Sequence, residues 1–420
     1  MRRQTDEPPK ETEMKDTELY EAILGMKKPW RVTGVRLDEE AGEVRVRVEC
    51  EGVVWACPHC AKRMHVHSHR GREWRHLDTC QYKTVIESDV LRVECEEHGT
   101  MTVQVSWAEK HSRETQQFEA HAIDVMKQTS GKAAASILRI SWDEMDGIKQ
   151  RAVDRGMARK AWAAPKVLCL DEKAAGHGQD YVTIATKVEG GKAVVDDVVE
   201  GRTRAAADSY FKRFTREDLA HVECIGMDMW KNYYNAAMAH VPGAVEKIIH
   251  DRYHLVSDLN GAVDEVRRQE RLLSKNGEVL KKTRRLWLYG KENLPAKERR
   301  RFKALLASNL KTAKAWMLKE LFRDMYGCTD GAEARSYFTD WYNRVIRSRI
   351  APMIKVARRF KDHLPNILTW FTHHLTNSYA EGVNNLIQTI IKKAYGYRNR
   401  ERLKRDILFH AGGLDLYPSI

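Results

Sequence analysis

The sequence predicts a multidomain protein that joins an α/β region to a long all-helical region. Strand-like apolar runs alternate with helical patterns over residues 166–256, which is typical of an α/β layer. Residues 257–370 have an almost wholly helical pattern and are very basic. Residues 17–110 combine alternating strand patterns with a cluster of cysteine and histidine residues. A chain of 420 residues is long enough for two to four domains.

The charge balance favours a polyanionic partner. The chain carries 72 basic and 59 acidic residues, which gives a formal net charge of +13. Between Arg271 and Arg323 there are 16 basic and 4 acidic residues. Nucleic acid is the commonest partner for a protein of this charge. The alternative interpretation is a basic surface that contacts only solvent.

Composition also bears on the compartment. No run of 18 apolar residues occurs, so we expect no membrane span. The first ten residues lack the apolar segment of a signal peptide. Eight cysteines are too few for a disulfide scaffold in a chain of this length. We therefore expect a protein of the reducing cytoplasm.

Two short cysteine–histidine motifs predict a structural zinc site. Cys57-Pro-His-Cys60 is followed, after strand-like sequence, by Cys95-Glu-Glu-His98. Two tight knuckles separated by strands are typical of a zinc ribbon, in which thiolate and imidazole ligands hold one tetrahedral Zn²⁺. Four protein ligands leave no open position, so we expect the ion to stabilise the fold rather than to catalyse a reaction.

A histidine-rich strand offers a competing ligand set and a possible nucleic-acid surface. Three of its histidines alternate, so their rings share one face, which fits either metal binding or a polar sheet face. Arginines follow on the same segment, and we expect them to contact phosphates. The histidines are His65, His67, His69 and His76, and the arginines are Arg70, Arg72 and Arg75.

Residues 111–163 predict a helical hairpin. A small-residue helix begins near Lys132, and Ser141-Trp-Asp-Glu144 is a capping box that starts the next helix. This order fits a helix-turn-helix that reads DNA, with Lys149 and Arg151 as contacts, and it also fits a hairpin that only packs. The acidic residues at the cap place any base contacts later in the helix.

Three acidic residues predict a metal-dependent catalytic site. Asp171 and Asp228 end apolar strand runs, and Glu381 begins a late helix. The order of three strands, a helix and a strand is that of the ribonuclease H-like fold, in which the first and fourth strands are neighbours. The two aspartates would then converge. Carboxylates suit Mg²⁺, and a pair of ions suits phosphodiester chemistry. Each acid taken alone fits a solvated carboxylate or a helix cap equally well.

Basic residues accompany these acids. Glu381, Asn385, Gln388 and Lys392 share one helix face, which suits DNA crossing the site. His254, just after the strand-like run Ala244–Ile249, fits either a contact to the scissile phosphate or a buried histidine.

The chain resembles bacterial insertion-sequence transposases of the ISL3 family, which carry an Asp-Asp-Glu catalytic set. The matching blocks extend from about residue 50 to 412. The more specific ones lie near the C-terminus. The blocks include Trp74-Arg-His-Leu-Asp78, Leu170-Asp-Glu172, Gly226-Met-Asp228, Asp251-Arg-Tyr-His254, Thr376-Asn-Ser-Tyr-Ala-Glu-Gly-Val-Asn384 and Ala394-Tyr-Gly-Tyr-Arg-Asn399. His98 departs from the family, which commonly has a fourth cysteine there.

The resemblance implies a DNA transposase that binds terminal inverted repeats and performs Mg²⁺-dependent cleavage and strand transfer. Asp171, Asp228 and Glu381 would hold two Mg²⁺ ions, for which Mn²⁺ can substitute. Arg398 joins the expected DNA contacts. The partners would be double-stranded DNA and further copies of the chain in a synaptic complex, in a bacterial, nucleoid-associated setting. A DNA-binding regulator derived from a transposase, and a structure-specific nuclease or resolvase, are the alternatives.

The resemblance also orders the domains and explains the long interval before Glu381. A ribonuclease H-like core would be interrupted by a helical insertion and preceded by a zinc ribbon and a helix-turn-helix. Tryptophans in the insertion fit either its core or stacking on a flipped base. The expected boundaries are a disordered segment at 1–16, a zinc-ribbon DNA-binding domain at 17–110, a helix-turn-helix at 111–163, the catalytic core at 164–256 and 371–420, and the insertion at 257–370.

Overall fold

The computed structural model describes two compact units. They comprise Met1–Lys160 with Leu414–Ile420, and Ala161–Gly413. The description covers every residue except 1–13, 53, 176–179, 274–276, 376–377 and 420. Most of the expected disordered segment 1–16 and the pair Thr376-Asn377 therefore lie outside the described residues. No helix within the described parts of the chain is long and apolar enough to cross a lipid bilayer.

The first unit begins with a five-stranded sheet. Its strand order is β1-β2-β4-β3, and β5 pairs with β4. In β2 the valines Val44, Val46 and Val48 are buried and alternate with less buried polar residues, because successive side chains of a strand point to opposite faces. The elements are α1 (Asp16–Ile23), β1 (Trp30–Asp38), β2 (Glu43–Cys50), β3 (His65–Thr79), β4 (Tyr82–Cys95) and β5 (Gly99–Thr102).

Three helices complete the first unit: α2 (Gln116–Gln128), α3 (Gly131–Leu138) and α4 (Trp142–Arg159). The predicted capping box is confirmed, because the Ser141 hydroxyl accepts from the Glu144 N–H while the Glu144 carboxylate accepts from the Ser141 N–H. Arg139 adopts a left-handed φ of 55° in the turn between α3 and α4. A short turn therefore joins the small-residue helix α3 to the capped helix α4.

The second unit contains a mixed five-stranded sheet in the order β10-β9-β6-β7-β8. Strands β6, β7 and β8 form antiparallel pairs, whereas β9 and β10 run parallel to β6. The first and fourth strands of the unit are thus neighbours, as predicted. The strands are β6 (Val167–Ala174), β7 (Tyr181–Glu189), β8 (Lys192–Glu200), β9 (Cys224–Met227) and β10 (Ile248–His250).

The prediction of a strand over Ala244–Ile249 is partly wrong. Ala244–Lys247 forms a helical turn, α8, and only Ile248–His250 pairs with β9. The turn follows Gly243, which adopts a left-handed φ of 68°. Ala, Glu and Lys favour helices over strands, so the composition of Ala244–Lys247 agrees with the observed turn, and the β-branched pair Ile248–Ile249 enters the sheet.

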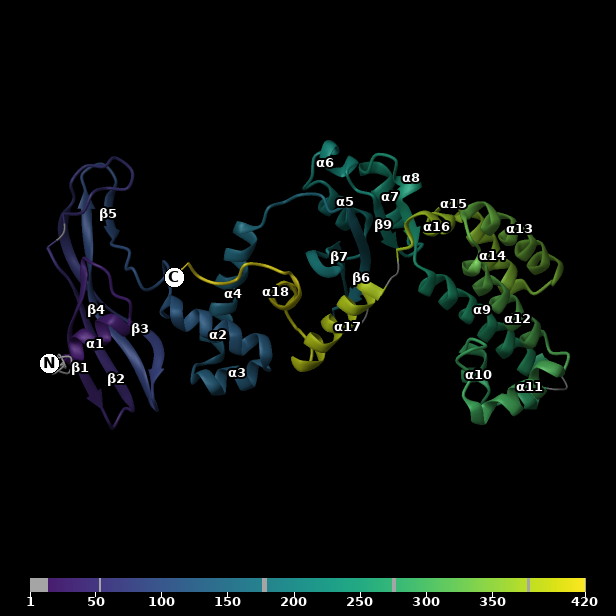
Figure 1. Ribbon diagram of the computed structural model, residues 1–420, viewed down its shortest axis with the longest axis horizontal. Helices are drawn as coiled ribbons and strands as arrows, with labels where there is room; N and C mark the ends of the chain where they lie inside the picture. Colours follow the sequence, from purple (N-terminus) through teal and green to yellow (C-terminus); the bar gives the residue numbers. More distant parts are fainter. Residues whose placement is uncertain (1–13, 53, 176–179, 274–276, 376–377, 420) are drawn as a thin grey trace, which may run out of the picture. The chain divides into compact units, whose positions relative to one another are not determined.

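Helices cover both faces of the second sheet (Figure 1). Leu168 and Leu170 of β6 belong to one buried hydrophobic cluster that also contains residues of α5 and α7. Asp171 has the opposite parity along the strand and accepts a hydrogen bond from Asn384 of α17. The covering helices are α5 (Arg204–Phe211), α6 (Arg216–Ala220), α7 (Lys231–His240), α17 (Ser378–Lys393) and α18 (Arg400–Ala411).

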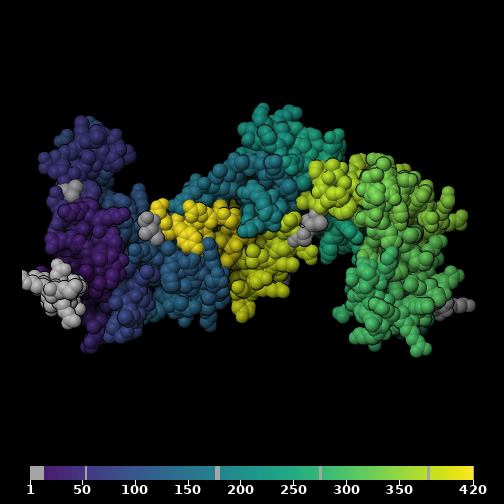
Figure 2. Space-filling model, in the orientation of Figure 1, coloured from purple at the N-terminus to yellow at the C-terminus, as the bar shows by residue number. Residues whose placement is uncertain are grey.

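The rest of the second unit is helical, and Figure 2 shows it in green as one continuous packed surface. Helix α9 begins at Arg252, so it crosses the expected boundary at residue 257. The helices are α9 (Arg252–Leu273), α10 (Arg284–Leu288), α11 (Arg299–Ala307), α12 (Lys311–Asp324), α13 (Gly331–Arg347), α14 (Ala351–Asp362), α15 (Leu364–Leu368) and α16 (Trp370–His373), with short 3₁₀ turns at Gly277–Leu280, Ala296–Glu298 and Met325–Gly327.

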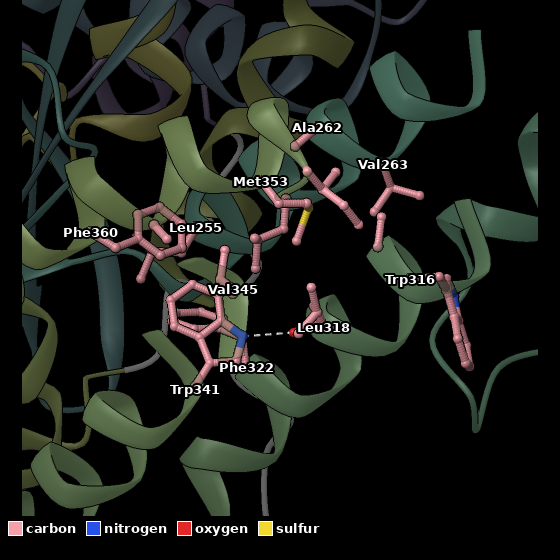
Figure 3. Packing of buried hydrophobic residues seen from close by; sticks show 14 of the residues in the cluster. Leu255, Ala262, Val263, Trp316, Leu318, Phe322, Trp341, Val345, Met353 and Phe360 are labelled. Carbon is pink, nitrogen blue, oxygen red and sulfur yellow. Dashed lines mark hydrogen bonds between the residues drawn. The ribbon is translucent and has the colours of Figure 1, made fainter. Parts of the chain in front are cut away.

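The tryptophans of this helical region belong to its core. Trp287, Trp316 and Trp341 are buried in one hydrophobic cluster, and Trp370 packs against it. The Trp341 indole N–H donates to the Leu318 carbonyl at 2.7 Å (Figure 3). Buried indoles whose N–H groups are hydrogen-bonded inside the protein stabilise the fold, so these side chains support its packing.

Candidate active site and zinc site

Three aspartates stand in line across adjacent strands of the second unit. Leu170 of β6 pairs with Met227 of β9, and Met227 pairs with His250 of β10. The next residues along the three parallel strands are Asp171, Asp228 and Asp251. Because the carboxyl ends of parallel strands meet at one edge of a sheet, this register brings the three carboxylates to the same edge.

Asp171 is held by hydrogen bonds from two directions. Its Oδ1 accepts from the Glu172 N–H at 2.8 Å, and its Oδ2 accepts from the Asn384 side-chain amide. Lys173 Nζ lies 3.4 Å from the Asn384 carbonyl oxygen, so α17 is tied to β6 at two points. Partial burial lowers the pKa of Lys173, and the nearby positive charge of Lys392 contributes in the same direction.

Glu172 is the most perturbed carboxyl group of this edge. Burial, followed by the negative charges of Asp228 and Asp171, raises its pKa to about 7. Its Oε2 atom is buried and has no hydrogen-bond partner among the described residues. The nearest cation is the Arg202 guanidinium, whose Nη1 is 3.9 Å from Glu172 Oε1. The edge therefore carries more negative charge than its own cations neutralise.

Asp228 and Asp251 share this environment. Burial raises the pKa of both carboxyl groups, and the charge of Asp171 adds to each shift. Backbone N–H groups partly compensate, because Trp230 donates to Asp228 at 2.8 Å and Tyr253 donates to Asp251 at 2.9 Å. His254 Nε2 lies 3.6 Å from Asp251 Oδ2, so this histidine is at the acidic edge.

Glu381 lies near this edge but is not gathered into one ligand set with the two aspartates. It is exposed in the first turn of α17, one helical turn before Asn384, which contacts Asp171. Among the described residues, the cysteine–histidine cluster of the first unit is the one group of at least three metal-ligating side chains close enough to share an ion. The structure thus aligns the aspartates and places Glu381 on the adjacent helix.

The four residues predicted as zinc ligands do come together. The ligand atoms of Cys57, Cys60, Cys95 and His98 all lie within 4.8 Å of one another. The distances from His98 Nδ1 to the sulfurs of Cys57 and Cys95, and from Cys60 to Cys95 sulfur, are each 3.6 Å. A tetrahedron with zinc–ligand bonds of about 2.0–2.3 Å has edges of roughly 3.3–3.8 Å, so the cluster fits Zn²⁺. A hydrogen bond with His98 is the main cause that lowers the pKa of Cys95.

The competing histidine set is dispersed. His65, His67 and His69 are exposed on β3, whereas His76 is buried and its Nδ1 lies 2.9 Å from the Thr115 hydroxyl. Burial, helped by the charge of Arg75, lowers the pKa of His76 to about 4. His98 is therefore the histidine that joins the three cysteines.

The predicted DNA contacts fall into two groups by exposure. Arg70, Lys392 and Arg398 are exposed, whereas His254 and Arg72 are half-buried. Arg75 is instead engaged inside the first unit, where it pairs with Asp78 and stacks over the Phe118 ring at 5.0 Å. Lys149 is buried on α4.

Arg151 belongs to a buried ionic network that joins α4 to α2. Its Nε donates to Glu119 at 2.6 Å and its Nη2 donates to Glu114 at 2.5 Å. On the next turn Arg155 pairs with Glu119 at 2.9 Å and with Glu109 at 2.7 Å. This use of Arg151 matches the packing alternative for the hairpin, since its guanidinium is already bound by carboxylates.

Sequence reasoning assigned no role to three residues that the structure places at the acidic edge. Asp251 follows a strand of only three residues, which is a weak sequence signal. Glu172 is adjacent to Asp171, which is itself the acid at the end of the apolar run. Asn384 is far from Asp171 in the chain, and only the fold brings them together. A signal existed, because all three lie in the blocks on which the family resemblance rests.

Comparisons with known proteins identify the family of the chain. A family model of ISL3-type transposases, described as "Transposase", matches residues 168–407, and a model described as the zinc-finger of transposase IS204/IS1001/IS1096/IS1165 matches residues 54–98. The transposase for insertion sequence element IS1001 of Bordetella parapertussis is 26% identical over 399 residues, which cover 92% of this chain and 96% of that protein.

A second relative is the transposase for insertion sequence element IS1557 of Mycobacterium tuberculosis. It is 24% identical over 428 residues, which cover 93% of this chain and 94% of the relative. The transposase model covers more than half of the chain, including Asp171, Asp228, Asp251 and the helix that carries Glu381. The chain therefore belongs to the ISL3 family of insertion-sequence transposases.

Proposed function

We propose that the chain is a DDE transposase that binds the terminal inverted repeats of its insertion sequence and catalyses Mg²⁺-dependent DNA cleavage and strand transfer. The observation that carries this proposal is the alignment of Asp171, Asp228 and Asp251 on three adjacent parallel strands, with α17 bound to Asp171 through Asn384. The strand order, with two parallel strands beside an antiparallel trio, supports a ribonuclease H-like core.

The acidic edge fits divalent cations. Its carboxylates are hard oxygen ligands, and burial together with the charge of Asp171 raises the pKa of Glu172 and of Asp228. The buried Glu172 Oε2 lacks a hydrogen-bond partner among the described residues. Asp171, Asp228 and Glu381 would hold the ions. Bound Mg²⁺, or Mn²⁺ in its place, would supply Lewis acidity toward a phosphodiester and lower the pKa of an attacking water or 3′-hydroxyl.

The residues around the acids then have distinct tasks. Asn384 orients the Asp171 carboxylate by donating a hydrogen bond to it. Lys173 and Lys392 place positive charge beside this carboxylate and attract a DNA strand to the edge. His254, half-exposed beside Asp251, is positioned to contact a phosphate oxygen of that strand. Glu381 would complete the acidic set from α17.

The first unit is the proposed end-binding part. The cysteine–histidine cluster would hold one structural Zn²⁺, and the helix–turn–helix α3–α4 would approach the DNA together with the exposed arginines of β3. Arg75, Lys149 and Arg151 would act indirectly by stabilising this unit. Cleavage of two ends requires their synapsis, so the active form would be a dimer or higher oligomer. The expected domain boundaries remain part of this proposal.

A plasmid excision assay tests the proposal. The substrate carries the inverted repeats that flank the gene on either side of a marker, and the readout is the excised product in the presence of Mg²⁺. We expect excision with the wild-type chain. Binding of the ends without any excised product would instead identify a DNA-binding regulator, and cleavage without joined strands would identify a nuclease or resolvase.

A further inference from the structure

A groove beside the edge strand of the first sheet is not part of the acidic edge or of the zinc cluster. It is bounded by β3, β4, β5 and residues 101–113, and its volume is about 840 Å³. The charged residues that line it are Arg47, Arg70, Arg72, Glu73, Glu87, Asp89, Glu109, Lys110 and Arg113. The groove therefore contains both acidic and basic side chains. Its ability to bind an anion depends on which of these side chains already form ion pairs.

Every acidic residue of the groove already has an arginine partner. Glu73 and Glu87 both pair with Arg45, and Asp89 pairs with Arg47. Glu109 pairs with Arg155 of α4 at 2.7 Å. Arg45 also pairs with Glu43, so it is shared among three carboxylates. None of these ion pairs uses Arg70, Arg72 or Arg113.

The remaining cations of the groove have no such partner. Within the described part of the chain, Arg70, Arg72, Lys110 and Arg113 form no ion pair with a carboxylate. Arg72 stacks over the Trp74 ring at 5.2 Å, and its Nη2 lies 3.4 Å from the Ser112 carbonyl oxygen. Burial lowers the pKa of Arg72, and the like charges of Arg70 and Arg113 add to that lowering. Arg72 is thus partly desolvated, and the exposed Arg70 and Arg113 place two further positive charges close to it.

The backbone fixes these arginines in position. Arg70 and Arg72 share one face of β3 with Trp74, because the register of β3 on β4 is regular from Ser68 to His76. The Arg113 segment is joined to β3, since its carbonyl oxygen accepts from the Arg75 N–H at 2.8 Å. The arginines therefore converge without depending on long, unsupported loops.

A buried hydroxyl of β4 lines the same groove. Ser88, directly opposite Arg72 in the sheet, lines the same groove and is only 1% exposed. Its hydroxyl is buried and has no hydrogen-bond partner among the described residues. A buried hydroxyl without a partner costs about 1–3 kcal/mol, so a bound acceptor would stabilise this side of the groove.

We propose that this groove binds the phosphate backbone of duplex DNA through Arg70, Arg72 and Arg113, with Lys110 at its rim. Guanidinium groups match phosphate oxygens in geometry and charge, and they contact phosphates without reading the bases. This inference rests on the proposed function, since it assigns the groove to the DNA that the chain processes. It adds Arg113, Lys110 and Ser88 to the residues expected from the sequence.

The test measures the affinity of the full-length chain for a fluorescent duplex that carries an inverted repeat, and for an unrelated duplex, over a series of salt concentrations. The variants are Arg70→Gln and Arg113→Gln, both at exposed positions, so folding is preserved. Each should weaken both duplexes by a similar factor of about five to ten and lower the slope of log K against log[salt] by about 0.9.

Arg36→Gln is the matched control, because Arg36 is exposed on β1 at the opposite edge of the same sheet. It should leave affinity and salt slope unchanged. Unchanged affinity and slope in both Arg70→Gln and Arg113→Gln would overturn the assignment. So would protection of the groove by inorganic phosphate without any loss of duplex affinity in these variants, which would indicate a site for a free anion.

Failure of this inference is distinguishable from failure of the proposed function. The control Arg36→Gln should cleave the ends at the wild-type rate, whereas Arg113→Gln should raise the DNA concentration at which cleavage is half-maximal. A wild-type chain that never cleaves, yet loses duplex affinity in the two arginine variants, would refute the proposed function and support the groove.

Discussion

Glu119 is the residue on which the buried ionic network of the first unit depends, and its removal gives a strong test of that network. Its side chain is 1% exposed. Its carboxylate accepts a hydrogen bond from Arg151 Nε at 2.6 Å and forms an ion pair with Arg155 Nη2 at 2.9 Å. Replacement by glutamine keeps the volume but removes the negative charge between two guanidinium groups. The α2–α4 contact should therefore be destabilised.

The size of the destabilisation depends on the carboxylate partners that each arginine keeps in the variant. Breaking a buried ion pair from one side costs about 3–5 kcal/mol, because a buried charge is left uncompensated. Arg151 keeps Glu114 and Arg155 keeps Glu109, so we expect the lower end, about 3 kcal/mol. In a unit of this size each kcal/mol lowers the melting temperature by about 2–4 °C, which gives about 6–12 °C.

Differential scanning calorimetry of Glu119→Gln measures this shift in the transition of the first unit. The control is Glu51→Gln, whose pair with Arg31 is more than half exposed on both sides and should contribute less than about 1 kcal/mol. A melting temperature for Glu119→Gln within about 1 °C of that of Glu51→Gln would refute the network. It would also reopen the assignment of Arg151 as a direct DNA contact.

Three other perturbations have outcomes that the structure predicts. Cys95→Ser should remove one equivalent of zinc by elemental analysis and lower the melting temperature of the first unit, whereas Cys80→Ser at an exposed, unclustered thiol should do neither. His76 has a folded pKa of about 4 against 6.5 in the unfolded chain, so its contribution to stability is complete above pH 6.5 and is lost as the pH falls toward 4. The loss should be at most about 3.4 kcal/mol by urea titration and should disappear in His76→Gln. The same pH dependence in that variant would exclude His76 as its source. Trp341→Ala should destabilise the helical region by about 3–5 kcal/mol through the cavity that it leaves. Leu272→Ala, at a site that is 81% exposed, should cost less than about 0.5 kcal/mol. Equal effects of the two variants would contradict the packing of Trp341 in the core.

Local patterns predicted those elements whose determinants are themselves local. The Ser141–Glu144 capping box and the alternating valines of β2 depend on neighbours a few residues away, and both are present in the structure. The pairing of Cys57-Pro-His-Cys60 with Cys95-Glu-Glu-His98 was also readable, because zinc chemistry restricts the spacing of its ligands. The adjacency of β6 and β9 followed from the order of strands and helices.

The rest depended on tertiary contacts that no local pattern encodes. Asn384 meets Asp171 across 213 positions of sequence, and Glu119 captures Arg151 only because α2 packs on α4. The predicted strand includes the segment Ala244–Lys247 together with Ile248 and Ile249, yet this segment forms a helical turn after Gly243, as its Ala, Glu and Lys residues favour. An arginine on an exposed helix pattern looks the same whether a carboxylate or a phosphate will bind it.

The rate of Mg²⁺-dependent strand cleavage at a labelled inverted repeat tests the acidic site most directly. Asp171→Ala, Asp228→Ala and Glu381→Ala should each lower the rate by more than about a hundredfold at saturating DNA while duplex affinity is retained. Glu223→Ala, an exposed acid directly before β9, serves as the control and should cleave normally. Cleavage at the wild-type rate by any of the three site variants would contradict the assignment of that residue to the catalytic set.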